Sequence, residues 1–95
     1  MIVKKSGKYI LREYTPTLIF VVEVLEDNST NEKEAYKLKI LKTIRGSLKP
    51  GDICSIRQFK SGQNASSTMG WELWDIDWFI KRYPQFKEQI EATTY

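Results

Sequence analysis

Two aspartates separated by one residue, Asp75 and Asp77, stand in the segment GWELWDIDWF (residues 70–79), which also holds all three tryptophans of the chain. Alternate carboxylates can hold a hard cation such as Mg²⁺ or Ca²⁺, but such a site needs further oxygen ligands. Glu72 is the only other carboxylate close by in the sequence. Either aspartate can instead cap a helix by accepting hydrogen bonds from the free amides of its first turn. We therefore predict a helix cap, and neither a metal site nor a cofactor.

Basic side chains concentrate in residues 36–60, where seven of them stand against Asp52 alone, whereas residues 23–35 are acidic overall. Lysines that alternate with apolar residues form a solvated strand face, which also discourages edge pairing. The same face could instead contact the phosphates of a single-stranded nucleic acid, with an aromatic ring stacking on a base. The candidate nucleic-acid-binding residues are Lys37, Lys39, Lys42, Arg45, Arg57, Phe59 and Lys60. Because the net charge is only +3, the solvated face is the main interpretation and nucleic-acid binding the alternative.

The chain has no histidine, which removes the commonest general base and the commonest zinc ligand together. No Ser–His–Asp or Cys–His system can be assembled from it, so we expect a protein that is not an enzyme. Cys54 lies in an apolar strand pattern and is interpreted as a small buried hydrophobe. A single cysteine cannot form an internal disulfide, and the longest apolar run, residues 18–22, is too short to span a bilayer. These features favour a soluble, cytoplasmic protein without a secretory signal or a membrane partner.

Five short segments with β-branched, aromatic or alternating apolar residues predict the strands that would position these groups. The strands are expected over residues 2–5 or 8–14, 17–25, 35–45, 53–59 and 71–74. The adjacent apolar residues Ile40 and Leu41 break the alternation and predict a β-bulge. Pro50 and Gly51 suit the two central positions of a β-turn. The polar segments 26–34 and 60–70 are expected to be loops.

A short helical turn over about 77–83 and a second helix from Pro84 to about Ala92 are expected at the end of the chain. Proline breaks a continuous helix but is well accommodated at the first position of a new one. The strand alternation puts Trp71 and Leu73 on one face, and Glu72 and Trp74 on the other. Most of the tryptophan side chains are therefore expected to pack at the junction of strand and helix, and Trp74 is singled out as a candidate ligand platform.

The segment YKLKILKTIRGSLKPGDICSI (residues 36–56) resembles a pattern in OB-like barrels of the netrin/tissue-inhibitor type. In that pattern an alternating strand leads through a KG and a KPGD turn into the next strand. The resemblance spans roughly residues 17–57 and implies a topology. The cysteines that fix the N-terminus of the inhibitors are absent, so protease inhibition is not carried over.

We therefore expect one mainly β domain over residues 1–95: an OB-like small β-barrel of about five strands (about 1–74) and a C-terminal helical segment (about 76–92). Closure removes the exposed strand edges of a small sheet. The helix is expected to contribute Phe79, Phe86 and Ile90 as a plug for the barrel. The expected function is a non-enzymatic binding module that contacts a protein partner. The alternative is an OB-fold protein that binds single-stranded DNA or RNA, and the sequence leaves the oligomeric state open.

Overall fold

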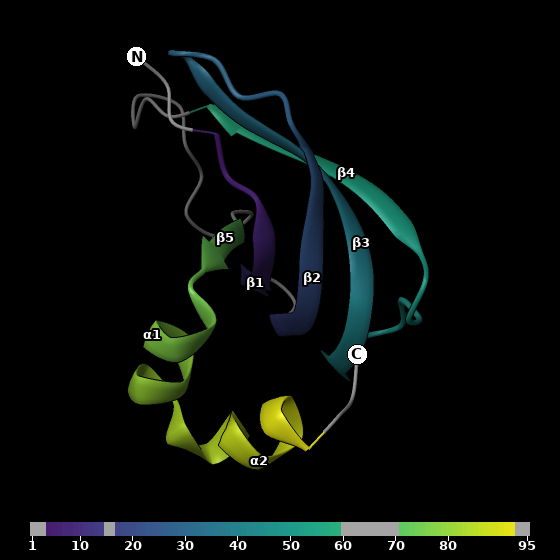
Figure 1. The fold of residues 1–95 in the computed structure, drawn as a ribbon, viewed down its shortest axis with the longest axis vertical. Helices are drawn as coiled ribbons and strands as arrows, with labels where there is room; N and C mark the ends of the chain where they lie inside the picture. The colour runs from purple at the N-terminus through teal and green to yellow at the C-terminus, as the bar shows by residue number, and fades with distance from the viewer. Residues whose placement is uncertain (1–3, 15–16, 60–70, 93–95) are drawn as a thin grey trace.

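The computed structural model describes residues 4–14, 17–59 and 71–92 of the chain. These residues form a curved antiparallel sheet with helices at one end (Figure 1). The strands are β1 (Gly7–Tyr14), β2 (Thr17–Asp27), β3 (Lys33–Arg45), β4 (Ile53–Phe59) and β5 (Trp71–Trp74), and the helical elements are α1 (Ile76–Arg82), the 3₁₀ turn η1 (Pro84–Phe86) and α2 (Lys87–Glu91). The prediction of a mainly β domain with a C-terminal helical segment is confirmed.

The strand order across the sheet is β4-β3-β2-β1-β5, and every neighbouring pair is antiparallel. The predicted bounds of β4 and β5 are confirmed, and β2 and β3 are each longer than predicted because their hairpin loop is shorter. The first strand follows the second of its two predicted placements and begins at Gly7. The last strand thus returns to the side of the first.

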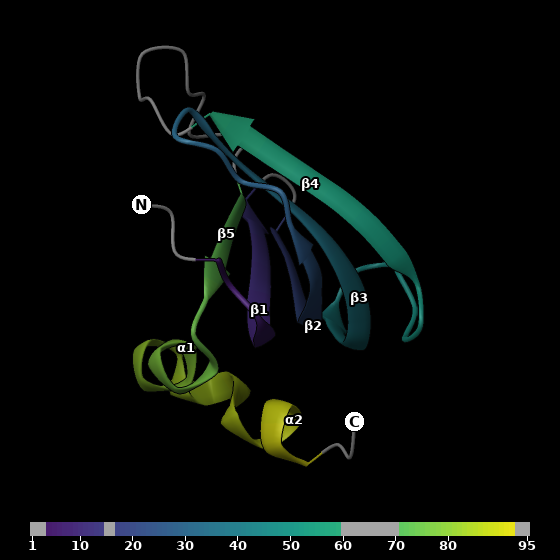
Figure 2. The same ribbon diagram turned by 45° about the horizontal axis from the view of Figure 1, so that its top comes forward.

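The prediction of a closed barrel is wrong, because β4 and β5 stay at opposite edges of the sheet in the described part of the chain. The sheet curls until one end of β5 approaches β4, as the two views show (Figures 1 and 2). There the indole Nε1 of Trp71 donates a hydrogen bond to the carbonyl oxygen of Arg57 at 3.2 Å. The Trp71 ring also meets Tyr36 edge to face, with 5.8 Å between the ring centroids. The Trp71 side chain therefore lies between β5 and β4, where a closed barrel would have backbone hydrogen bonds between the two strands.

Local features of β3 agree with the sequence. The pairing register between β2 and β3 shifts where Ile40 opposes Val22 and Lys42 opposes Val21, which confirms the bulge at Leu41. Residues 49–52 form the predicted turn, in which the Asp52 amide donates to the Lys49 carbonyl at 3.0 Å. Gly51 has a φ of +95°, which suits a residue without a side chain.

The two faces of the sheet carry separate apolar clusters. The concave face, on which Trp71 reaches β4, buries Leu11, Phe20, Val22, Val24, Tyr36, Leu38, Ile40 and Trp71. The convex face buries Ile10, Ile19 and Val21 from the sheet, together with Phe79 and Ile90 from the helices. The helices therefore cover one end of the convex face (Figure 2).

The prediction that Phe79, Phe86 and Ile90 plug a barrel is therefore wrong. Large side chains of the strands already fill the concave face, with Phe20, Leu38 and Ile40 fully buried there. The apolar stripe of the helices instead packs on the convex face against Ile10 and its neighbours.

The helical segment starts and breaks as the sequence indicates. The Asp75 carboxylate accepts a hydrogen bond from the Trp78 amide at 3.2 Å, which confirms a capping aspartate. Helix α1 ends at Arg82, and Pro84 begins the 3₁₀ turn that leads into α2. Among the described residues, no helix is long and apolar enough to cross a membrane.

Candidate functional site

The basic residues singled out in the sequence divide between two places on the convex face. The register places Lys37 opposite Glu26 and Lys39 opposite Glu23 on β2, while Arg57 on β4 lies opposite Ala35. These three cations belong to the part of the convex face next to β4. The Lys37 ammonium lies 3.5 Å from a Glu26 carboxylate oxygen, so this part of the face carries both signs of charge.

Lys42 and Arg45 lie further along β3, at the end covered by the helices. The Lys42 ammonium donates a hydrogen bond to the Gln89 carbonyl of α2. Arg45 lines a cavity between the sheet and the helices. Phe59 ends β4, but its side chain falls outside the described part, as does the whole of Lys60. The described cations therefore do not form one continuous patch.

The outer edge of β4 presents backbone groups that no other strand of the described chain uses. On β3, the Ile40 amide donates to the Asp52 carbonyl and the Ile40 carbonyl accepts from the Gly51 amide, both on the β4 side, whereas the Ala35 carbonyl accepts from the Asn28 amide on the β2 side. Bonding direction alternates along an antiparallel strand, so Tyr36 and Leu38 also bond toward β4, through Ile56 and Cys54.

The intervening residues of β4, Ile53, Ser55 and Arg57, therefore direct their N–H and C=O groups outward. The hydrogen bond from the Trp71 indole to the Arg57 carbonyl agrees with this assignment and occupies that one acceptor. The side chain of Ile53 is 57% exposed, the largest exposed fraction among the large hydrophobic residues described. Ile53 and Ser55 thus carry backbone groups that no described strand pairs with, and Ile53 adds an exposed apolar side chain.

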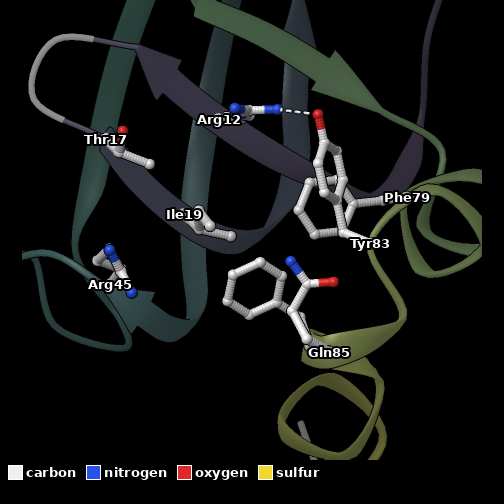
Figure 3. A pocket seen from close by; sticks show the side chains of 8 residues that line it. Arg12, Thr17, Ile19, Arg45, Phe79, Tyr83 and Gln85 are labelled. Carbon is white, nitrogen blue, oxygen red and sulfur yellow. Dashed lines mark hydrogen bonds between the residues drawn. The ribbon is translucent and has the colours of Figure 1, made fainter.

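A cavity of about 180 Å³ lies between the convex face and the turn from α1 into η1. Its walls consist of Ile19, Phe79 and Phe86, with Arg12, Thr17, Arg45, Tyr83 and Gln85 as polar lining. Arg12 and Arg45 come from different strands and lie on either side of Ile19 (Figure 3). Of these polar groups, only Arg45 is among the residues predicted from the sequence, because the others are far apart in the chain and share no motif.

Arg12 is held in place by Tyr83. Its guanidinium Nη1 donates a hydrogen bond to the Tyr83 hydroxyl at 2.5 Å, drawn as a dashed line in Figure 3. The guanidinium carbon also lies 4.9 Å from the centroid of the Tyr83 ring, within the range of a cation–π contact. The half-buried Arg12 side chain is thus positioned by the helical segment as well as by its own strand.

Trp74 lies behind the wall of this cavity. Its ring meets Phe79 at 5.7 Å and Tyr83 at 5.9 Å between centroids, both edge to face. Its indole N–H is buried and has no hydrogen-bond partner among the described residues. Trp71 and Leu73 pack on the concave face, as the alternation predicts. By contrast, Trp78 on α1 is 55% exposed, so the prediction that the tryptophans pack at the junction of strand and helix is wrong for this residue.

Two further candidate residues, Cys54 and Asp75, occupy structural positions in the described part of the chain. Cys54 packs against the apolar cluster of the concave face, where burial raises its thiol pKa and the charges of Glu13 and Asp52 raise it further. A raised pKa leaves less of the nucleophilic thiolate. Asp75 serves as a helix cap, and no group of three or more Cys, Asp or Glu side chains in the described residues could hold a metal ion.

Comparison with protein-family models, with curated protein sequences and with solved structures gave no significant match.

Proposed function

We propose that the protein is a non-catalytic binding module that takes an extended segment of a partner protein onto the outer edge of β4. The observation that carries the proposal is the outward direction of the backbone groups of Ile53 and Ser55. A peptide that adds a strand to such an edge gains main-chain hydrogen bonds, and its alternate side chains provide specificity.

Within the described residues, the β4 edge lacks several of the features that prevent strand addition. Natural edge strands are often very short, bulged, or interrupted by proline or inward-pointing charges. Strand β4 runs over seven residues, contains no proline and pairs with β3 without a register shift. The opposite edge, β5, has only four residues and is protected by its shortness. Recognition is therefore assigned to β4 rather than to β5.

The charges nearest to this edge favour an acidic partner segment. The exposed Arg57 lies on β4, and the exposed Lys39 lies on the adjacent strand. Their carboxylate neighbours, Glu23 and Glu26, stand on β2, which is one strand spacing of roughly 4.8 Å further from the edge. An extended segment with acidic side chains and an apolar residue beside Ile53 would complement this surface.

Nucleic-acid binding is the less favoured alternative. A phosphate-binding surface needs several cations that follow one backbone, whereas Lys37 is engaged with Glu26 and Lys42 with α2. Lys39 and Arg57 lie next to the β4 edge and Arg45 lies at the cavity, whereas the Phe59 side chain and the whole of Lys60 fall outside the described residues.

We also propose that the module works in a reducing compartment such as the cytoplasm, because Cys54 is a free thiol packed against a core. We further propose that residues 17–57 share the strand topology of netrin-type OB-like barrels, without inhibitor activity.

The experiment compares three affinity baits in a host lysate: the natural chain, Ser55→Pro and Ser55→Ala. Proline at position 55 removes an N–H that faces away from β3, so the internal ladder stays intact while an added strand loses a donor. We expect a partner that binds the natural chain and Ser55→Ala, is lost with Ser55→Pro, and is retained after nuclease treatment. Amide hydrogen exchange at Ile53 and Ser55 should slow in the complex.

A partner held equally by Ser55→Pro would refute strand addition at this edge. Loss of every partner on nuclease treatment would instead support the nucleic-acid alternative. In that case, affinity for a single-stranded oligonucleotide should fall steeply as the salt concentration rises.

A further inference from the structure

We infer that the cavity between the convex face and the α1–η1 turn binds a carboxylate carried by a small apolar group, with Arg12 and Arg45 holding the carboxylate. This site goes beyond the proposed partner-binding edge, because its residues lie on β1, the far ends of β2 and β3, and the helical segment. Either site can therefore fail without the other.

The sheet register brings the two arginines to one place. Arg12 pairs with Ile19, and Ile19 pairs with Arg45, so the three residues form one row across β1, β2 and β3. Neighbouring strands are about 4.8 Å apart, which separates the two arginine Cα atoms by roughly 10 Å. Two long side chains from these positions can converge on one group above Ile19, where Figure 3 shows the cavity.

The register shift beside Ile19 is what gives Arg45 this position. Thr43 opposes Phe20 and Arg45 opposes Ile19, so Ile44 is the extra residue of an irregularity in β3. Without it, Ile44 would stand opposite Ile19, and an apolar side chain would replace the guanidinium in the row. The extra residue in β3 therefore places a second cation, Arg45, at the cavity.

One of the two cations of the cavity is already held in position without a ligand. Tyr83 holds the Arg12 guanidinium by a hydrogen bond and a ring contact. No acidic residue is among the eight that line the cavity in the described part of the chain; Glu72 of β5 stands opposite Arg12 but outside the lining, and Thr17 and Gln85 supply neutral hydrogen-bonding groups. Two guanidinium groups with no carboxylate in the lining favour a negatively charged ligand.

The size and the walls indicate what the anion carries. A cavity of about 150 Å³ can hold benzene, so this cavity of about 180 Å³ has room for one ring-sized apolar group beside a carboxylate. Ile19, Phe79 and Phe86 provide the apolar walls. A carboxylate matches the planar fork of a guanidinium with a single charge, whereas a doubly charged phosphate would need more donors than this largely apolar cavity offers. The shared ligand chemistry could come from a small free acid or from the C-terminal residue of a polypeptide.

The test is an NMR titration of the intact protein with phenylacetate, with its neutral amide phenylacetamide, and with phenyl phosphate. Phenylacetate should shift the amide signals of Ile19, Arg45 and Gln85, and phenylacetamide should bind at least about tenfold more weakly because it lacks the charge. Arg45 is exposed, so Arg45→Gln should fold normally and lower phenylacetate affinity by about tenfold or more. Lys49→Gln, which removes an exposed cation outside the cavity, should leave that affinity unchanged.

Two further ligands distinguish the sources: the tripeptide Ala-Ala-Phe with a free C-terminus, and the same tripeptide as its C-terminal amide. Tighter binding of the free-acid tripeptide than of phenylacetate would assign the site to polypeptide C-termini, and weaker binding would assign it to small free acids. Equal binding of phenylacetate and phenylacetamide, preference for phenyl phosphate, an unchanged affinity in Arg45→Gln, or no shifts at these amides would overturn the inference.

Discussion

Replacing Gly46 with alanine tests how tightly the corner after β3 is packed. Gly46 has a φ of +144°, a conformation that residues with a side chain rarely adopt. A Cβ atom built at this position would lie 2.5 Å from Cζ and 2.9 Å from Cε1 of the Phe20 ring. Phe20 is fully buried in the core of the concave face, so the ring cannot move aside without disturbing its neighbours.

The expected loss of unfolding free energy in Gly46→Ala is the sum of two costs. A side chain forced into such a backbone conformation costs about 1–3 kcal/mol. Overpacking a filled core costs about the same amount again, about 1–3 kcal/mol. Gly46→Ala should therefore lower the free energy of unfolding by roughly 2–6 kcal/mol, which is a large part of the 5–15 kcal/mol typical of a domain.

Urea unfolding measures this loss, and Gly51→Ala is the matched control. Gly51 also has a positive φ, +95°, but a Cβ atom there would meet nothing within 4 Å. The control should therefore show the backbone cost alone. A second measurement places Gly46→Ala in a Phe20→Leu background, in which part of the steric cost should disappear as a favourable coupling.

A steric clash with Phe20 is refuted if Gly46→Ala is no more destabilising than Gly51→Ala, or if the Phe20→Leu background gives no coupling. Because Gly46 directly follows Arg45, the substitution should also weaken phenylacetate binding at the cavity, provided that the variant stays folded under the conditions of the titration.

Two further predictions concern the helix cap and a buried phenol. Asp75→Ala should lower the free energy of unfolding by about 1 kcal/mol in urea, since the amide of Trp78 loses its acceptor; Asp77→Ala, which removes no capping bond, is the control. Burial, opposed by a hydrogen bond with Ser29 and reinforced by Glu34, raises the pKa of Tyr36 to about 12 from an ordinary value of 10.0. The folded state then holds this proton more tightly than the unfolded state, so the contribution is complete below pH 10 and is lost as the pH rises through 12. Tyr36→Phe should accordingly lose less stability than the natural chain over that interval, and parallel unfolding curves against pH would contradict the assignment.

The local elements of this protein could be predicted from the sequence because their causes are local. Pro50 and Gly51 impose a turn whatever surrounds them, and Pro84 ends a helix for reasons within its own few residues. The adjacent Ile40 and Leu41 break a two-residue period, which reveals a bulge without any partner strand. The alternation of Trp71 and Leu73 with Glu72 and Trp74 likewise assigns faces correctly.

The candidate sites were only partly predictable. Lys37, Lys39 and Arg57 share a face, as a strand period suggests, but the acidic residues interposed beside them come from β2 and depend on register. The backbone groups of Ile53 and Ser55 point outward because β4 pairs with β3 on one side only among the described strands. The residues of β4 themselves do not indicate on which side that partner lies. The cavity gathers Arg12, Arg45 and Tyr83 from three distant parts of the chain.

By itself, the sequence of this protein determined where strands, turns, the bulge and the helix cap occur, since each follows from periodicity or from the backbone preferences of one or two residues. Only the tertiary structure decided that the sheet stays open, that the helices pack on the convex face, and that the basic residues divide between an edge and a cavity. Those outcomes depend on how much space large side chains such as Trp71 and Phe20 occupy between strands. The packing of these side chains involves residues far apart in the chain, so a local sequence pattern does not predict it.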